Sequence, residues 1–227
     1  MQELLISGTW RETYPGASAG ILAMRNVVNP AHHTALARRK QELERTLRAR
    51  YAEYDRAKLK ALPTLQAYNA YYRQFKKTYH VQLQLESIAF KNKSIPSVAA
   101  LVEAMFMAEL DDMLLTSGHD LDAVQLPIKI DVANGSERFV RINGQEQQLK
   151  EGDMIIADQT DILSSVIYGP DRRTQITPET RQVLYTTYAP PGVGGEAVRL
   201  HLEGIRDNVS LVSPDAGVLQ LQVYSAT

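Results

Sequence analysis

The chain has 227 residues, of which 44% are hydrophobic and none is cysteine. This composition excludes disulfides and thiolate metal sites, and it supplies enough apolar residues for one folded domain with an appendage. The net charge of -1 hides an asymmetry, because residues 1–100 carry 16 Lys and Arg but only 7 Asp and Glu. Such a split marks either a polyanion-binding face or two solvated surfaces of opposite sign that attract each other.

The first elements in chain order are a strand and two helices. Residues 18–24, SAGILAM, predict a short buried strand after the Pro15-Gly16 turn. Residues 35–62 place leucines and tyrosines on one helical face, and Pro63 is expected to end that helix. A second helix is expected over residues 64–77, with its aromatic side chains on one face.

These two helices are expected to pair as a charged helical hairpin, residues 35–77. The outer face of the hairpin is rich in Lys and Arg, which is typical of a surface that contacts a phosphate backbone. The candidate RNA-binding residues are Arg45, Arg48 and Arg50.

The next segments lead from helices into strands. Residues 81–90 alternate like a strand at first and then follow helical spacing, so the residues alone leave both open. Residues 96–116 predict a helix, with Pro96 in its first turn and Gly118 as a left-handed cap beyond its end. From Pro127 onward, short apolar runs separated by Asn-Gly and similar turns predict a largely antiparallel sheet, although residues 198–205 also fit a helix. The fold class is therefore α+β.

Two stretches gather reactive side chains, residues 114–124 (LLTSGHDLDAV) and residues 167–180 (IYGPDRRTQITPET). In the first, three interpretations stay open. Ser117, His119 and Asp120 have the residue types of a nucleophilic triad; His119, Asp120 and Asp122 have those of a metal site; or an aspartate caps the next segment while His119 is a structural donor.

The second stretch has two interpretations of its own. Gly169 to Thr174 could form an anion-binding nest that carries Arg173, or a plain hairpin loop with a solvated Asp-Arg pair. Trp10 and the tyrosines near residue 70 could stack on bases, but aromatic residues at helical spacing more often belong to a core. No motif for a nucleotide, zinc or other cofactor is present, so no metal and no cofactor are expected.

Three segments in a fixed order carry a family resemblance: GHDLDAV, INGQEQQLKEGDMIIAD and SVIYGPDRRTQITPETRQVLY. They resemble the B3/4 domain of the bacterial phenylalanyl-tRNA synthetase beta chain, in its free-standing form. The match runs from about residue 96 to residue 205. The resemblance implies that residues 1–227 form a single B3/4-like domain, a three-layer sandwich of mostly antiparallel sheets and helices. It also favours a helix for residues 83–90.

In the synthetase, the resembling domain hydrolyses the ester of misacylated tRNA, mainly tyrosyl-tRNA. The family's residues are a histidine before an FD pair, a glutamate that ends a strand, and backbone at an IxG turn. Here Ser117 stands at the histidine position and Thr186 at the glutamate position, while Gly169 is retained. The resemblance therefore supports a shared scaffold and pocket better than a shared substrate.

The resulting expectation is a trans-acting hydrolase for the ester of misacylated tRNA. His119 and Ser117 are the catalytic candidates, with His119 facing the cavity as general base. The substrate-binding candidates are Gly118, Asp120, Tyr168, Gly169, Arg173, Thr174 and Thr186. The alternative is a non-catalytic module that binds tRNA, another RNA or a small ligand. A weaker one is a protein adaptor that uses the charged hairpin.

No segment predicts export or membrane insertion. The first ten residues lack the basic start and apolar core of a signal peptide. No run approaches the ~18 apolar residues that span a bilayer. We therefore expect a cytoplasmic protein that makes no membrane contact.

Overall fold

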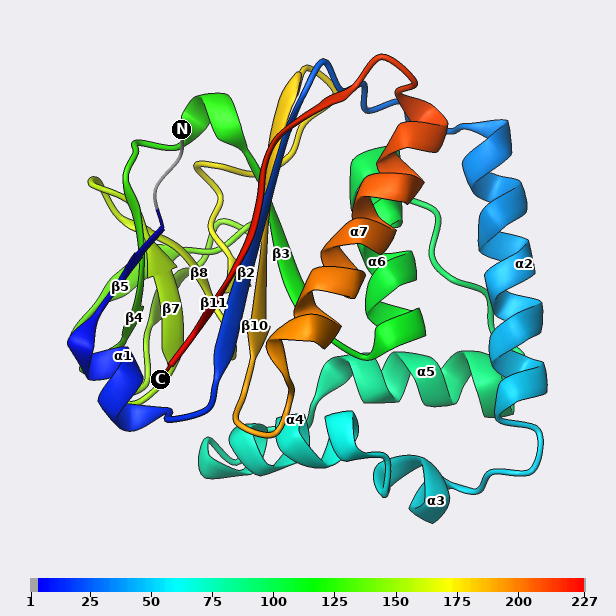
Figure 1. Cartoon of the computed structure of the whole chain (residues 1–227), viewed down its shortest axis with the longest axis horizontal. Helices are drawn as coiled ribbons and strands as arrows, with labels where there is room; N and C mark the ends of the chain where they lie inside the picture. Colours follow the sequence, from blue (N-terminus) through cyan, green and yellow to red (C-terminus); the bar gives the residue numbers. More distant parts are fainter. Residues whose placement is uncertain (1–3, 227) are drawn as a thin grey trace.

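Three layers of secondary structure lie side by side in Figure 1, which shows the computed structural model; it describes residues 4–226. The first layer is a five-stranded sheet in which β1 and β4 are parallel and the other pairs are antiparallel. Its strand order is β1 (Leu4–Ile6), β4 (Ile128–Val132), β7 (Met154–Ala157), β8 (Ile162–Ser165) and β9 (Gly169–Pro170).

The middle layer is an antiparallel sheet of four strands. Its order is β11 (Gly217–Ser225), β2 (Ser18–Arg25), β10 (Gln182–Ala189) and β3 (Leu115–Asp120). Strand β2 is buried over Ser18 to Met24 because the other two layers cover both of its faces. Strand β3 is an edge strand, and this position decides what it can present to a ligand.

Helices form the third layer. Helices α6 (Ala100–Asp112) and α7 (Gly195–Val212) cover the outer face of the middle sheet, and α2 (Thr34–Arg50) packs on them. The close approach of α7 to β2 requires Gly20, since a Cβ there would lie 2.5 Å from Val198 Cγ1. The α+β, three-layer expectation is thus confirmed.

Two further helices close one end of the layers. Helices α4 (Pro63–Gln74) and α5 (His80–Lys91) lie across the bottom of Figure 1, preceded by the short α3 (Arg56–Lys60). The helical interpretation of residues 83–90 is confirmed, and residues 198–205 lie within α7. The remaining elements are α1 (Gly8–Thr13), the 3-10 turn η1 (Leu121–Ala123), β5 (Arg138–Val140) and β6 (Glu146–Gln148).

Tyrosines on α4 join that helix to both sheets. The Tyr68 hydroxyl accepts from the Leu115 amide at 2.9 Å and donates to the carbonyl of Tyr188. The Tyr72 hydroxyl donates to the Val166 carbonyl at 2.8 Å. These rings, and Trp10, are buried, which confirms that they belong to the core rather than to a base-stacking surface.

The predicted hairpin of helices over residues 35–77 is wrong in two respects. Helix α2 ends at Arg50, so the expected helix is broken before α3, and Pro63 begins α4 instead of terminating its predecessor. Helix α2 packs against α5, α6 and α7 rather than pairing with α4. The reason is that the tyrosine face of α4 bonds to strand ends and is unavailable to α2.

The helix predicted over residues 96–116 is shorter than expected. It runs from Ala100 to Asp112, and Met113 adopts the left-handed cap, with φ 62°, that we assigned to Gly118. Gly118 lies inside β3. The Glu109 carboxyl accepts from the Thr116 amide at 2.8 Å, so the chain leaves α6 directly into an edge strand.

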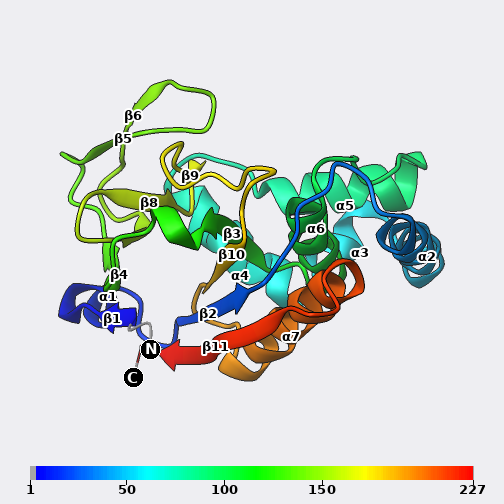
Figure 2. The same ribbon diagram turned by 90° about the horizontal axis from the view of Figure 1, so that it is seen from above.

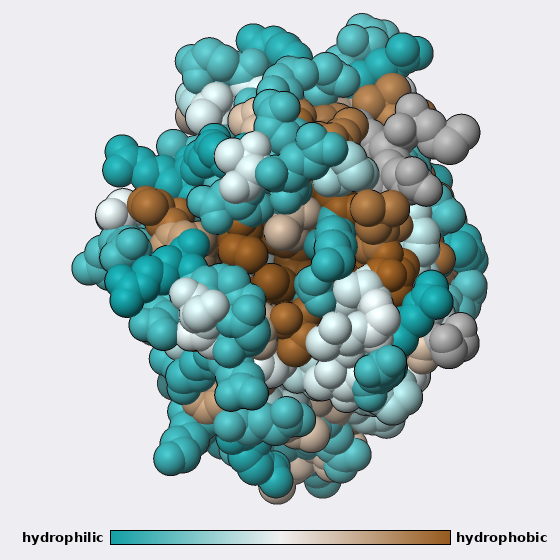
Figure 3. Space-filling model, turned by 90° about the vertical axis from the view of Figure 1, so that its left-hand side faces the viewer, coloured by the Kyte–Doolittle hydropathy of each residue, from teal (hydrophilic) through white to brown (hydrophobic). Residues whose placement is uncertain are grey.

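The surface differs between faces. The β5–β6 hairpin projects beyond the layers in Figure 2. On the side of the five-stranded sheet, Figure 3 shows apolar side chains gathered near the centre and bordered by polar ones. No helix among residues 4–226 is both long and apolar enough to cross a membrane.

Candidate functional site

A cavity of about 550 Å³ lies beside the free edge of β3. Most of its wall is apolar, contributed by α6, β3 and the segment between β8 and β9. The apolar side chains are Val98, Val102, Met105, Phe106, Leu115, Ile142, Val166, Ile167 and Ile176. The polar groups include Glu109, Ser117, Ser165, Tyr188 and, at the mouth, His80, Arg141 and Tyr168. An apolar pocket with a few converging polar groups is the usual form of a small-molecule site.

Ser117 and His119 point to the same face of β3 because they are two residues apart in a strand. Ser117 Oγ lies 2.9 Å from His119 Nε2. It also lies 2.9 Å from Ser164 Oγ and 2.8 Å from Thr186 Oγ1. Ser117 lines the cavity, whereas His119 is 0% exposed and stands behind it. The expectation that His119 faces the cavity is therefore wrong.

The far side of His119 is fixed by the segment after β9. His119 Nδ1 lies 2.8 Å from Thr174 Oγ1 and 3.8 Å from Asp171 Oδ1. Since the Thr174 hydroxyl donates to the Asp171 carboxylate, its oxygen accepts from His119 Nδ1–H. A neutral His119 then presents an unprotonated Nε2 to Ser117. The acid in line with Ser117 and His119 is thus Asp171, not the neighbouring Asp120.

The backbone of β3 adds a donor at the cavity. The Thr116 amide points away from β10 and donates to Glu109, and the Asp120 amide donates to the Thr174 carbonyl at 2.7 Å. Strand alternation directs the Gly118 amide to the same free edge. Among the described residues no protein acceptor is found for it, and Gly118 lines the cavity.

Glu109 places an acidic group in this wall. It is only 2% exposed, and burial raises the pKa of its carboxyl to about 8, although the hydrogen bond from the Thr116 amide acts in the opposite direction. The carboxyl is therefore largely neutral at pH 7. A cation that entered the cavity beside it would favour ionisation and gain a buried partner.

Four of the predicted site residues line this cavity: Ser117, Gly118, Tyr168 and Gly169. Thr174 and Thr186 are buried behind it, bonded to His119 and Ser117 respectively. Sequence reasoning missed Glu109, whose signal was a lone acid in the apolar run AMFMAEL, and Asp171.

Two predicted substrate-binding residues serve other roles. Asp120 accepts from the Asp122 amide at 3.0 Å and caps η1, as the capping alternative foresaw. Arg173 donates to Asp158 at 2.8 Å and to the Ala123 carbonyl at 2.7 Å. The nest interpretation of Arg173 is wrong because its guanidinium is directed to these partners and not to the cavity.

The predicted RNA-binding arginines are mostly engaged within the protein. Arg48 pairs with Glu44 at 3.3 Å, and Arg50 pairs with Asp111 at 2.8 Å. Only Arg45 of the three stands exposed on α2 with no partner among the described residues.

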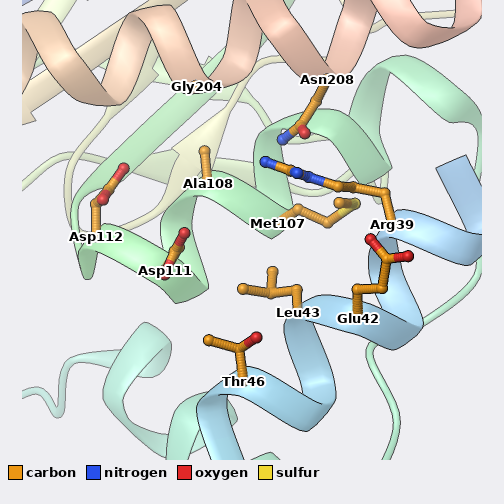
Figure 4. Close-up of a pocket in the computed structure, with 10 residues that line it drawn as sticks. All are labelled: Arg39, Glu42, Leu43, Thr46, Met107, Ala108, Asp111, Asp112, Gly204 and Asn208. Carbon is orange, nitrogen blue, oxygen red and sulfur yellow. The ribbon is translucent and has the colours of Figure 1, made fainter. Parts of the chain in front are cut away.

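A second hollow of about 250 Å³ lies between α2, α6 and α7 (Figure 4). Its wall mixes the charges of Arg39, Glu42, Asp111 and Asp112. Asp112 lies 3.1 Å from His201 Nδ1, and Asp111 pairs with an arginine, so both carboxylates already have partners. Within the described part of the chain, no group of three or more His, Asp or Glu is arranged to hold a metal ion.

Comparison with known proteins bears on the same region. A family model described as the B3/4 domain matches residues 65–203. Among solved structures, the chain is similar to an N-terminal fragment of the phenylalanyl-tRNA synthetase beta-subunit from Pyrococcus horikoshii, with 10% identity and a TM-score of 0.48. That match covers 98% of this chain and 52% of the other, so this chain spans about half of that fragment's length. No curated protein matches the chain.

Proposed function

Because the chain belongs to the B3/4 domain family, whose model matches residues 65–203, we propose that it acts on aminoacylated tRNA by hydrolysing the aminoacyl ester. The observation that carries this proposal is the hydrogen-bonded chain from Asp171 through Thr174 and His119 to Ser117. That chain ends on the cavity wall, next to the open amide of Gly118.

The cavity accommodates the parts of an aminoacyl ester in a consistent order. The side chain of the amino acid enters the apolar lining. Its α-ammonium group reaches Glu109, whose raised pKa makes ionisation depend on such a partner. The ester carbonyl accepts from the Gly118 amide, which then stabilises the negative charge that develops on that oxygen during attack.

The polar chain supplies the proton transfer. A water molecule held by the Ser117 hydroxyl attacks the ester carbon, and its proton passes through Ser117 to His119 Nε2. The bond between the carbonyl carbon and the ribose oxygen then breaks, and the ribose oxygen takes the proton. Thr174 and Asp171 hold His119 in the required tautomer and stabilise its protonated form. His119 thus acts through Ser117 and is a positioning residue.

The test is a panel of aminoacyl-tRNAs incubated with purified protein, with the fraction of intact ester measured over time. We expect at least one ester to be lost faster than in buffer. The variants Ser117→Ala and His119→Asn should lower kcat about 10²- to 10⁴-fold and change KM only a few-fold.

His201→Asn is the matched control. His201 is also 0% exposed and bonded to a threonine, Thr116 at 2.7 Å, but it lies on the opposite face of β3. This variant should keep kcat within a few-fold of the wild type. If no ester is lost faster than in buffer, or if His201→Asn is as damaging as His119→Asn, the hydrolase proposal fails.

One observation favours a second function, the binding of an aminoacyl group without turnover. Ser117 is only 4% exposed, and its Oγ already lies within hydrogen-bond distance of His119, Ser164 and Thr186. A hydroxyl held by three protein groups activates water poorly. In that case a non-hydrolysable aminoacyl-adenosine amide should bind, Glu109→Gln should weaken its binding, and no ester should be hydrolysed.

A further inference from the structure

A polar groove of about 490 Å³ lies on the outer side of α3, α4 and α5, apart from the cavity described above. Its wall contains no apolar side chain: it is formed by Lys60, Gln66, Asn69, Arg73, Lys77, Thr78 and Gln82. A groove of this composition does not suit an apolar ligand or a helix face. Its three cations suit an anion.

The charge of the groove is not neutralised by its own elements. Residues 56–85 contain six Lys and Arg and neither Asp nor Glu. The acid behind the groove is Glu86, whose side chain is 4% exposed. Its carboxylate already receives Arg56 at 2.6 Å and Gln82 Nε2 at 2.6 Å. Lys60, Arg73 and Lys77 form no ion pair among the described residues, and Lys60 acts on Glu86 only as a nearby charge that helps to lower its pKa.

Some cations of helix α2, in contrast, are neutralised by ion pairs with acidic side chains. Lys40 pairs with Glu103 at 3.1 Å, and Arg50 pairs with Asp111. Along α2, Lys40, Arg48 and Arg50 thus have acidic partners, whereas no ion pair among the described residues involves Lys60, Arg73 or Lys77 of the groove. The positive charge of the first hundred residues is therefore partly paired along α2 and unpaired in the groove, so the groove is the better surface for binding an anion.

The groove has a prepared polar floor. Asn69 Nδ2 donates to Gln82 Oε1 at 2.7 Å, and Gln82 in turn donates to Glu86. These bonds fix the orientation of both amides before any ligand arrives. Exposed Gln66 and Thr78 add further hydrogen-bonding groups beside the cations. The hydroxyl and phosphate oxygens of a ligand can bind both the amide and hydroxyl side chains and the cations of the groove.

The groove leads to the mouth of the cavity. Lys77 lines the groove, and its ammonium lies 5.7 Å from the centre of the Tyr168 ring. Tyr168 and His80 line the cavity, while Thr78 lines the groove. A chain that carries a negative charge at each unit can therefore lie along the groove and place its end in the cavity.

We propose that this groove binds the phosphodiester backbone of an RNA strand whose 3′ end enters the cavity. The inference rests on the proposed function, because it takes the aminoacylated end of tRNA as the occupant of the cavity. It assigns RNA contact to Lys60, Arg73 and Lys77 in place of the arginines of α2. A free phosphate ion would need one such cation, whereas a strand engages them in series.

The experiment uses the full chain and a fluorescent single-stranded RNA that carries no aminoacyl group, so that no ester chemistry is involved. Binding is measured across a series of KCl concentrations for the wild type and for the groove variant, Lys60→Gln/Arg73→Gln/Lys77→Gln. Single strands lose affinity with a slope of about 0.7 in log Kd against log salt per phosphate contact. The groove variant should therefore lower the slope by about 2 and weaken binding at 50 mM KCl more than tenfold.

The matched control removes the same charge elsewhere: Arg38→Gln/Arg45→Gln/Lys91→Gln, all exposed residues. The control should keep a slope within a few tenths of the wild type. Equal effects of the two variants, or no effect of the groove variant, would overturn the proposal. The free energy of unfolding of both variants should lie within about 0.5 kcal/mol of the wild-type value, because only exposed side chains change.

Two further arms separate other anions. Inorganic phosphate at millimolar concentration should not displace the RNA, and vesicles with anionic lipid should not bind more tightly than neutral ones. Displacement by phosphate, or vesicle binding that the groove variant abolishes, would assign the groove to a different anion and overturn the proposal. A wild type that binds RNA through the groove but hydrolyses no ester would remove the proposed function and leave the RNA contact in place.

Discussion

The Nε2 atom of His119 lies 2.9 Å from Ser117 Oγ, and the two residues occupy alternate positions on one face of β3. The pleat of the strand therefore sets their separation. The partners of His119 on its other side, Thr174 and Asp171, come from the chain that follows β9. The pair is fixed by a strand and a turn that are far apart in the sequence.

Thr174→Val tests this arrangement. Removing the hydroxyl leaves His119 Nδ1–H and the Asp171 carboxylate without their shared partner in a buried site. The free energy of unfolding, measured with urea, should fall by about 1–3 kcal/mol. Thr46→Val, an exposed threonine of α2, is the control and should change it by less than about 0.5 kcal/mol. Equal effects at the two sites would contradict the buried chain.

Glu109→Gln tests the burial of the cavity's carboxyl through pH. The folded-state pKa of about 8 lies above the ordinary 4.5, so the folded state retains a proton that the unfolded state releases. The free energy of unfolding of the wild type should therefore fall as the pH rises from about 4.5 to about 8. Glutamine does not titrate.

The free energy of unfolding of the variant, relative to that of the wild type, should accordingly rise by about 1.4 kcal/mol per pH unit in that window, and by several kcal/mol in total. Urea unfolding at pH 5 and pH 8 measures the difference, and other titrating groups cancel between the two proteins. A difference that is independent of pH would show that Glu109 is not held neutral in the folded state.

Gly118→Ala tests how tightly the cavity edge is packed. A Cβ at this position would lie 2.8 Å from Ile176 Cδ1 and 3.3 Å from Tyr185 Cε1. We expect a loss of about 1–3 kcal/mol in unfolding free energy. Ile176→Val removes the nearer atom, so the double variant should recover part of that loss.

Gly204→Ala provides the contrast for the same substitution. No atom lies within 4 Å of a Cβ built on this glycine of α7. Alanine in a helix interior should stabilise the protein by about 0.5–1 kcal/mol. If the two substitutions had the same sign, the close contact at Gly118 would not be real.

Tyr68→Phe tests the join between α4 and the middle sheet. The change removes a buried hydroxyl that accepts from the Leu115 amide and donates to the Tyr188 carbonyl. Two buried backbone groups lose their partner, so unfolding free energy should fall by about 1–3 kcal/mol. Tyr54→Phe, at a surface ring 36% exposed, should be nearly neutral. A thermal unfolding series of the two variants is sufficient.

Local patterns in the sequence predicted individual elements, whereas the three-layer arrangement was predicted from the family resemblance. The uninterrupted apolar run at residues 18–24 gave a strand buried on both faces, since a central strand needs no polar side. The Asn143-Gly144 turn gave the β5–β6 hairpin, in which Gly144 has φ 81°. These are local signals, and each depends on a few adjacent residues.

The errors arose where distant contacts outweigh local preference. Glycine is the usual left-handed cap, yet Met113 adopts φ 62° because Glu109 draws the following chain into β3. Arg50 pairs with Asp111, 61 residues away, and no sequence pattern around Arg50 predicts this ion pair. In the same way, Asp171 lies 52 positions beyond His119, so no motif search near His119 finds it.

The edge position of β3 also bears on how the protein behaves when concentrated. An unprotected edge strand offers a row of amides and carbonyls on which a foreign strand can build a ladder, and this leads to fibres. The outward amides of Thr116 and Asp120 are already taken by Glu109 and Thr174. A single outward donor, at Gly118, is too little for an incoming strand. The two contacts on either side of the Gly118 amide thus also protect this edge of the sheet against self-association.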